Sequence, residues 1–289
     1  MILVTGAGGY IGGKAVYRLR DLAMPVVAMG RDEARLRKSV PPETPLAIAD
    51  YDDPGSLDRA FAGITGLLFV AGDGFAGDMM RQHANVIDAA ERQRIAHVVF
   101  TSIVDIEDSS PFYYATVYRD AEQRLEASRF AVAIIRCGLY CEFIHRHWLA
   151  EPMISLPLAD ARIAPVSRDD VADAAVEAVV ERADGVWNMT GSRSYSMPEI
   201  SRVASAAMGR GFTYRDCPPD EYLTRLEAEL DDPWPVAFSS MCASIREGRF
   251  AQVSARYPAS ATRRPEDFES YLRRNSTAAC PTSTEDLPS

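Results

Sequence analysis

The sequence has no long hydrophobic run. Although 47% of its 289 residues are apolar, no stretch approaches the roughly 18 to 20 apolar residues that a membrane-spanning helix needs. The apolar residues 1–4 follow no basic leader, so a signal peptide is not expected either. These absences exclude a membrane protein and predict a cytoplasmic one, with room for one large α/β domain or a nucleotide domain with a smaller companion.

Basic residues are outnumbered by acidic ones. The chain carries 31 basic and 41 acidic residues, which gives a net charge of −10, and it contains no basic run. Because polyanions bind where basic side chains gather, this balance argues against a nucleic-acid partner. We therefore expect a small-molecule substrate as the partner, and the oligomeric state stays open, a homodimer included.

Cysteines with metal-binding spacing are missing. The five cysteines lack the short paired spacing of a zinc site, so no metal is expected. Cys137 and Cys141 are four positions apart and could share a helical face. Two free thiols in a reducing compartment are nevertheless a simpler interpretation than a disulfide.

What the sequence does contain is a strand, a glycine turn and a helix in direct succession at its start. Gly6, Gly9 and Gly12 stand three residues apart. This spacing permits a tight turn, a close backbone approach to a pyrophosphate and close packing of helix on strand. The free N–H groups of the helix N-terminus would then face the phosphates. A glycine triplet alone is a weak signal, but its place between strand and helix predicts a dinucleotide site that includes Tyr10 and Ile11 as well.

Short apolar runs continue to alternate with helical segments along the chain. Strands are predicted at residues 25–30, 45–49, 67–72, 96–100 and 131–136. Alternation of strand and helix favours an α/β fold with a Rossmann-type doubly wound parallel sheet. Ligands in such folds lie at the carboxyl ends of the strands.

The chain is expected to divide into a larger and a smaller part. Residues 1–150 are predicted to form the dinucleotide-binding Rossmann domain, with returning segments near 160–195. Residues 151–275 are predicted to form a smaller mixed α/β substrate-binding region. The last segment, 276–289, is rich in Ser, Thr and Pro with almost no periodic apolar residue, so it is interpreted as a disordered tail.

The end of the second predicted strand indicates which dinucleotide binds. An NAD site carries an acidic side chain there, whereas here the place falls on Gly30 or Arg31. An arginine fork suits a 2′-phosphate, so NADPH is the predicted cofactor. Asp32 beside it, or a merely solvated Arg31, would argue otherwise. Further residues expected beside the cofactor lie at the other strand ends: Asp50, Tyr51, Ala71, Gly72, Thr101, Cys137 and Gly138.

Several segments resemble a known enzyme family. The opening Thr-Gly-Ala-x-Gly-x-x-Gly pattern resembles that of extended and atypical short-chain dehydrogenase/reductases. Four later segments resemble their NmrA-like branch, which includes NAD(P)H:quinone oxidoreductases: residues 100–102, 134–140, 165–172 and 187–191. The resemblance covers roughly residues 1 to 275 and implies an NAD(P)H-dependent oxidoreductase.

The resemblance also implies catalytic residues, with one departure. Short-chain reductases use a serine at the end of the strand that corresponds to residues 96–100, a tyrosine as proton donor, and a lysine four positions after the tyrosine. Ser102 and Tyr114 match the first two, but Tyr118 stands where the lysine belongs. Without an ammonium beside it, Tyr114 should keep a pKa near the usual value of about 10 and act poorly as a base.

Tyr118 is therefore the polar group expected nearest the nicotinamide. In the quinone-reductase-like branch the tyrosine–lysine pair is often missing, and Tyr118 occupies the place where such relatives carry a lysine or a histidine. A purely structural alternative stays open, in which Tyr113, Tyr114 and Tyr118 are packing aromatics at the start of a helix.

An apolar pocket wall is expected after the strand at 131–136. Small-molecule sites combine such a wall with one or two polar groups. The candidates are Tyr140, Phe143, His147 and Trp148. His147 is a candidate proton donor, although a histidine beside aromatic residues more often has a structural role. Trp234, Phe238 and Met241 either close the pocket from the second domain or belong to its core.

These residues favour an NADPH-dependent reductase that transfers hydride to an electron-poor, apolar small molecule. A quinone, an enone or an imine fits, because hydride transfer to such an acceptor needs no protein acid. The missing lysine leaves room for a non-catalytic NAD(P)-sensing regulator of the NmrA type. A redox-neutral isomerase or dehydratase on the same scaffold is the second alternative.

Overall fold

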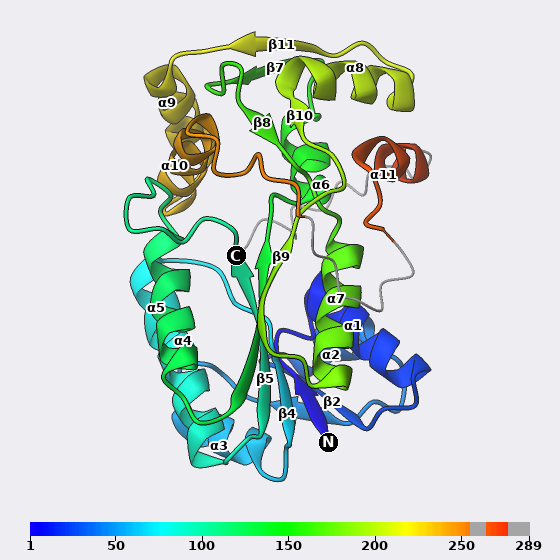
Figure 1. Ribbon diagram of the computed structural model, residues 1–289, viewed down its shortest axis with the longest axis vertical. Helices are drawn as coiled ribbons and strands as arrows, with labels where there is room; N and C mark the ends of the chain where they lie inside the picture. Colours follow the sequence, from blue (N-terminus) through cyan, green and yellow to red (C-terminus); the bar gives the residue numbers. More distant parts are fainter. Residues whose placement is uncertain (255–263, 277–289) are drawn as a thin grey trace.

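A seven-stranded parallel sheet forms the lower part of the molecule, and a second lobe sits at the carboxyl ends of its strands (Figure 1). The computed structural model describes residues 1–254 and 264–276. The sheet has the order β3-β2-β1-β4-β5-β6-β9, and every neighbouring pair is parallel. The predicted Rossmann-type doubly wound sheet is thus confirmed. Its strands are β1 (Ile2–Val4), β2 (Val26–Gly30), β3 (Leu46–Ile48), β4 (Gly66–Phe69), β5 (His97–Ile103), β6 (Ala131–Cys137) and β9 (Gly185–Met189).

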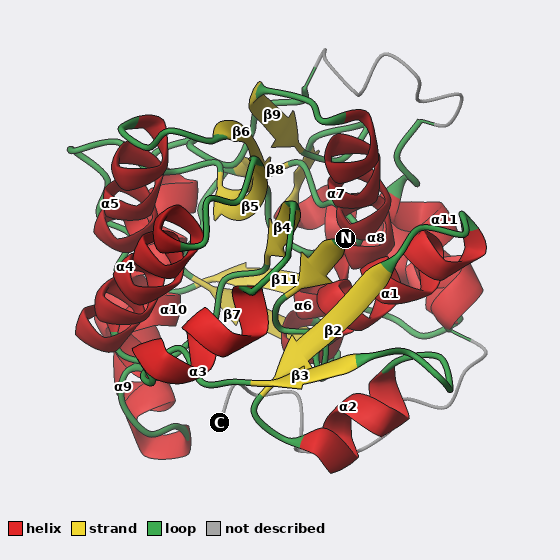
Figure 2. Cartoon of the chain, turned by 90° about the horizontal axis from the view of Figure 1, so that it is seen from below, coloured by secondary structure: helices red, strands yellow, loops and turns green. Residues whose placement is uncertain are grey.

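Helices cover both faces of this sheet (Figure 2). Successive side chains of a strand point to opposite faces, so Leu68 packs in one apolar cluster and its neighbour Leu67 in the other. A strand buried on both faces reads as an unbroken apolar run, which is what β4 shows. One face carries α1 (Tyr10–Asp21), α2 (Glu33–Ser39) and α7 (Arg168–Glu181), and the other carries α3 (Pro54–Phe61), α4 (Ala76–Arg92) and α5 (Ala115–Glu126).

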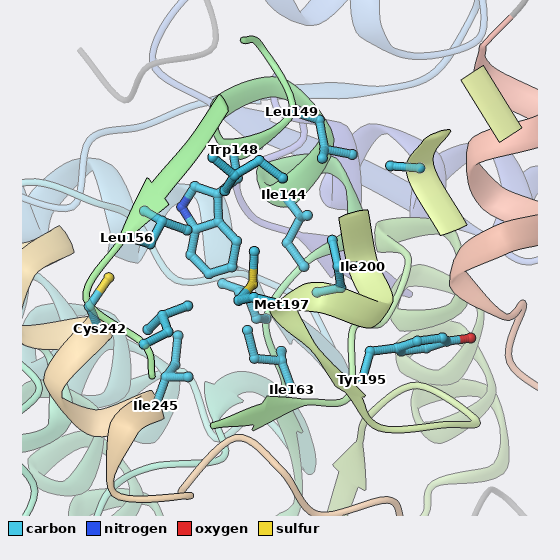
Figure 3. Close-up of a cluster of buried hydrophobic side chains, with 14 of the residues drawn as sticks. Ile144, Trp148, Leu149, Leu156, Ile163, Tyr195, Met197, Ile200, Cys242 and Ile245 are labelled. Atoms are coloured by element: carbon cyan, nitrogen blue, oxygen red, sulfur yellow. The ribbon is translucent and has the colours of Figure 1, made fainter. Parts of the chain in front are cut away.

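The second lobe has two small sheets and its own core. Parallel β7 (Met153–Leu156) and β11 (Thr213–Asp216) form one sheet, and antiparallel β8 (Arg162–Ile163) and β10 (Tyr195–Ser196) form the other. These strands and the surrounding helices bury a single apolar cluster, part of which Figure 3 shows. The helices are α6 (Cys141–Phe143), the π-helix η1 (Ile144–Trp148), α8 (Met197–Met208), α9 (Pro219–Glu229), α10 (Trp234–Arg246) and α11 (Phe268–Asn275).

The remaining sequence predictions concern thiols, the tail and membrane segments. The four described cysteines are buried free thiols: Cys137, Cys141, Cys217 and Cys242. The predicted disordered tail, 276–289, lies outside the described residues apart from Ser276, which follows the last turn of α11. Of the helices in the described part of the chain, none has the length and apolar character for crossing a membrane.

Candidate active site

A cavity of about 870 Å³ opens at the carboxyl ends of the sheet strands, where the second lobe meets the sheet. It is large enough for a dinucleotide end and a small apolar molecule. Every residue that the sequence placed beside a cofactor lines it. These residues are Gly6, Gly9, Tyr10, Ile11, Gly12, Arg31, Asp50, Tyr51, Ala71, Gly72, Thr101, Cys137 and Gly138.

The glycine turn at the start of the chain leaves no space for side chains. Gly6 adopts φ +59°, a left-handed conformation that favours glycine. A Cβ on Gly12 would meet the Gly6 carbonyl oxygen and carbon, the latter at 2.7 Å. Gly9 is the N-cap of α1 and provides no side-chain cap, so the first N–H groups of the helix remain available to an anion. This turn fits a dinucleotide pyrophosphate.

Hydrogen bonds hold the end of β4 beside the turn. The Thr5 hydroxyl oxygen accepts the Val70 N–H at 3.0 Å, and the Thr101 hydroxyl oxygen accepts the Ala71 N–H at 3.1 Å. The Tyr51 hydroxyl donates to the Val70 carbonyl at 3.0 Å. Tyr51 and Thr101 therefore shape the cavity floor as well as line it.

Two arginines line the cavity where β2 ends and α2 begins. Arg31 and Arg35 are both exposed and both line it, and among the described residues neither forms an ion pair. The Nε of Arg35 donates to the Gly8 carbonyl at 3.1 Å. The Asp32 carboxylate accepts the backbone N–H of Arg35 at 3.1 Å and thereby caps α2. The acidic neighbour that argued against a phosphate site is thus bound to its own helix.

The hydroxyl of Ser102 is bound to a buried carboxylate. Its Oγ donates to Glu122 Oε1 at 2.5 Å, and Glu122 is 2% exposed. Arg136 binds the same carboxylate through Nη2 at 2.5 Å and Nε at 3.0 Å. The register of β5 and β6 places Ser102 directly opposite Arg136. Ser102 lines the cavity as expected, but its hydroxyl donates to Glu122 and not into the cavity.

The two candidate tyrosines differ in their hydrogen bonding. The Tyr114 hydroxyl donates to the Gly74 carbonyl at 2.8 Å. The Tyr118 hydroxyl has no hydrogen-bond partner within residues 1–254 and 264–276. Burial raises the pKa of Tyr114 above its usual value, so the expectation of an unshifted phenol was wrong. Burial raises the pKa of Tyr118 as well, and both phenols are therefore protonated at neutral pH.

Aromatic side chains line the opposite, apolar end of the cavity. Phe143 and Tyr140 lie there as expected, and Phe238 and Met241 approach from α10. Trp234 does not line the cavity, and its ring packs against Phe238 with the ring centroids 5.7 Å apart. His147 does not line the cavity, because its ring packs behind Phe143, with ring centroids 4.7 Å apart.

Trp148 does not line the cavity either. It is 5% exposed and belongs to the core of the second lobe, where Figure 3 shows it among Ile144, Leu156 and Met197. The backbone N–H of Leu149 binds the Ile144 carbonyl, five residues back, at 3.0 Å. This wider turn changes which side chains share a face, so the prediction from ordinary helical spacing was wrong for this segment.

Sequence reasoning missed several lining residues. Arg35 had a detectable signal, since it is a second arginine, in the first turn of the helix that follows Arg31. The others come from loops or from helices α4 and α7, where no local pattern marks them: Asp73, Gln82, Phe112, Arg168 and Phe250. No cluster of three or more potential metal ligands occurs in the part of the chain that the structure describes.

Comparisons with known proteins agree with this geometry. A family described as NAD(P)H-binding matches residues 6–182, which is more than half of the chain. Quinone oxidoreductase 2 of Escherichia coli K12 is 26% identical over 239 residues, covering 79% of this chain and 82% of that protein. An NmrA-like family domain-containing oxidoreductase of Aspergillus flavus is 25% identical over 233 residues, covering 76% of each.

A solved structure with the same fold carries a dinucleotide. The triphenylmethane reductase of Citrobacter sp., complexed with NADP(H), matches with a TM-score of 0.84 and 21% identity, over 96% of this chain and all of that one. At this identity the likeness shows the fold alone. The family match over residues 6–182 shows that the chain belongs to the NAD(P)H-binding family, and the two relatives agree with its expected place in the NmrA-like branch of atypical short-chain dehydrogenase/reductases.

Proposed function

We propose that this NAD(P)H-dependent oxidoreductase uses NADPH to reduce an electron-poor, apolar small molecule such as a quinone, an enone or an imine. The observation that carries the proposal is the single cavity that joins the glycine turn and Arg31 at one end to the aromatic wall at the other. NADPH, when bound, supplies the hydride. Two similar proteins, quinone oxidoreductase 2 and triphenylmethane reductase, are named for electron-poor aromatic or quinonoid acceptors, which supports an acceptor of this class.

Tyr118 is the residue proposed to act on the acceptor. In this proposal its protonated hydroxyl donates to the acceptor atom that gains negative charge as the hydride arrives, such as the oxygen of a quinone or an enone. A preorganised donor stabilises such charge. The hydroxyls of Tyr114 and Ser102 already donate hydrogen bonds to the Gly74 carbonyl and the Glu122 carboxylate, respectively. Because burial raises the pKa of Tyr118, it serves as a hydrogen-bond donor and not as a base.

Stopped-flow oxidation of NADPH against a panel of quinones and enones tests the proposed function. We expect NADPH to be consumed rapidly with at least one class of acceptor. Tight NADPH binding with no oxidation by any acceptor would instead support the sensor of the NmrA type. Conversion of substrate without net NADPH consumption would support the redox-neutral alternative.

Replacement of Arg31 or Arg35 by alanine is expected to weaken NADPH binding about tenfold or more, because a hydrogen bond to a charged group contributes about 1.5–3 kcal/mol. NADH, which lacks the 2′-phosphate, should bind the variants as it binds the wild type. Calorimetric titration with both cofactors measures this. Arg37→Ala is the matched control, since Arg37 lies on the same helix as Arg35 but binds Glu33 and the Thr44 carbonyl. Unchanged NADPH affinity in both variants would refute the 2′-phosphate assignment.

Tyr118→Phe is expected to lower kcat at least tenfold with an enone and less with a quinone, because the quinone is the stronger hydride acceptor. A preorganised hydrogen-bond donor of this kind contributes roughly 10²–10³-fold to kcat. The NADPH dissociation constant should not change. Tyr114→Phe removes a hydroxyl that binds Gly74, so it should lower thermal stability more than kcat. Full activity of Tyr118→Phe with both acceptors would remove Tyr118 from the mechanism.

A further inference from the structure

The apolar end of the cavity contains an arginine that the proposed chemistry does not use. Arg168 is the first residue of α7 and lines the cavity together with Tyr140 and Phe143. Its guanidinium carbon lies 5.3 Å from the centroid of the Tyr140 ring, which is a cation–π distance. Figure 1 shows α7 starting beneath α6, where the sheet meets the second lobe, and a parallel bridge joins Tyr140 to Val166 at this junction.

This guanidinium has no anionic partner in the part of the chain that the structure describes. No carboxylate oxygen there lies within 4.0 Å of it. Arg18 and Arg274, by contrast, bind Asp173 and Glu266 at 2.8 and 2.7 Å. An arginine beside an apolar wall in a partly enclosed cavity is costly to leave without an anion, because burial of an unpaired charge is unfavourable.

The neighbouring carboxylates have other partners. Glu142 accepts the backbone N–H of Arg168 at 3.1 and 3.2 Å and not its guanidinium. Asp169 binds Lys14 Nζ at 3.0 Å and the Tyr10 hydroxyl at 3.0 Å. These contacts hold the start of α7 in place and leave the guanidinium donors of Arg168 to a ligand.

We propose that Arg168 binds an anionic group of the substrate, a carboxylate or a similar oxyanion, while the flat apolar body of the substrate packs against Phe143 and Phe238. The proposal rests on the proposed function, which assigns this end of the cavity to the substrate. The guanidinium fork matches a carboxylate through two parallel hydrogen bonds. The phosphates of the cofactor have their own place at the glycine turn and at Arg31.

The test uses two probes that cannot accept hydride, 2-naphthoate and its neutral analogue 2-naphthamide. Each is titrated calorimetrically into the wild-type protein saturated with NADP⁺. We expect the wild type to bind 2-naphthoate about tenfold or more tightly than 2-naphthamide, as a hydrogen-bonded charge pair implies. Arg168→Gln should remove this preference, and Arg168→Lys should retain part of it. Arg162→Gln, which alters an exposed arginine bound to Glu199 outside the cavity, should keep all of it.

Two results would overturn the proposal. One is equal affinity of the wild type for both probes. The other is a loss of NADP⁺ affinity in Arg168→Gln with the preference for 2-naphthoate unchanged, which would assign the guanidinium to the cofactor phosphates. Because neither probe is reduced, failure of the quinone and enone panel would refute the proposed reductase activity without affecting this comparison.

Discussion

Gly12→Ala is expected to weaken NADPH binding severely. The added Cβ would clash with the carbonyl oxygen of Gly6, and it would lie 2.7 Å from the Gly6 carbonyl carbon and 2.9 Å from the Ala7 Cα. All three are backbone atoms, so no side chain can rotate away and the turn itself must move. Overpacking of this kind costs about 1–3 kcal/mol, and here the displaced atoms are the phosphate site. We expect the NADPH dissociation constant to rise about a hundredfold or more.

Gly77→Ala is the matched control for this substitution. Gly77 lies in the first turn of α4, and a Cβ there meets nothing within 4 Å. Alanine is favoured over glycine within a helix by up to about 1 kcal/mol, so this variant should be at least as stable as the wild type and bind NADPH equally well. Fluorescence titration of NADPH and thermal unfolding of both variants measure the contrast. NADPH affinity of Gly12→Ala within threefold of wild type would contradict the assignment of the turn.

The cofactor end of the cavity was predictable because its determinants are local. Gly6, Gly9 and Gly12 lie within one turn, and the ends of parallel strands meet at one edge of a sheet whatever the details of packing. The position of Arg31 follows from the end of a single strand. No contact between distant segments is needed to place these residues.

The substrate end depended on contacts between distant segments. Met241 and Phe250 reach the cavity from a lobe that follows the sheet strands in sequence, and their apolar side chains suit a core equally well. Trp148 belongs to that core because a π-helix replaces the ordinary turn. The direction in which the Ser102 hydroxyl donates depends on Glu122, which lies 20 residues further along the chain in α5.

Glu122→Ala is expected to be strongly destabilising. Glu122 is 2% exposed, and Arg136, which binds it at 2.5 Å, is 25% exposed. Removal of one partner of a buried pair leaves the other charge uncompensated, which costs about 3–5 kcal/mol. At about 2–4 °C per kcal/mol for a chain of this size, the melting temperature should fall by roughly 6–20 °C. Glu126→Ala, one turn further along α5 at an exposed position, should shift it little.

A double variant separates the cost of the unpaired charge from the cost of lost packing. In Glu122→Leu/Arg136→Met no charge remains to be compensated, and apolar replacement of a buried pair is often neutral or stabilising. We therefore expect thermal unfolding of the double variant to return most of the stability that Glu122→Ala loses. A double variant as unstable as Glu122→Ala would mean that the pair stabilises the fold in its own right. In both variants the Ser102 hydroxyl loses the carboxylate to which it donates its hydrogen bond, so it is free to turn toward the cavity. A changed KM for the hydride-accepting substrate, with an unchanged NADPH affinity, would report that rotation.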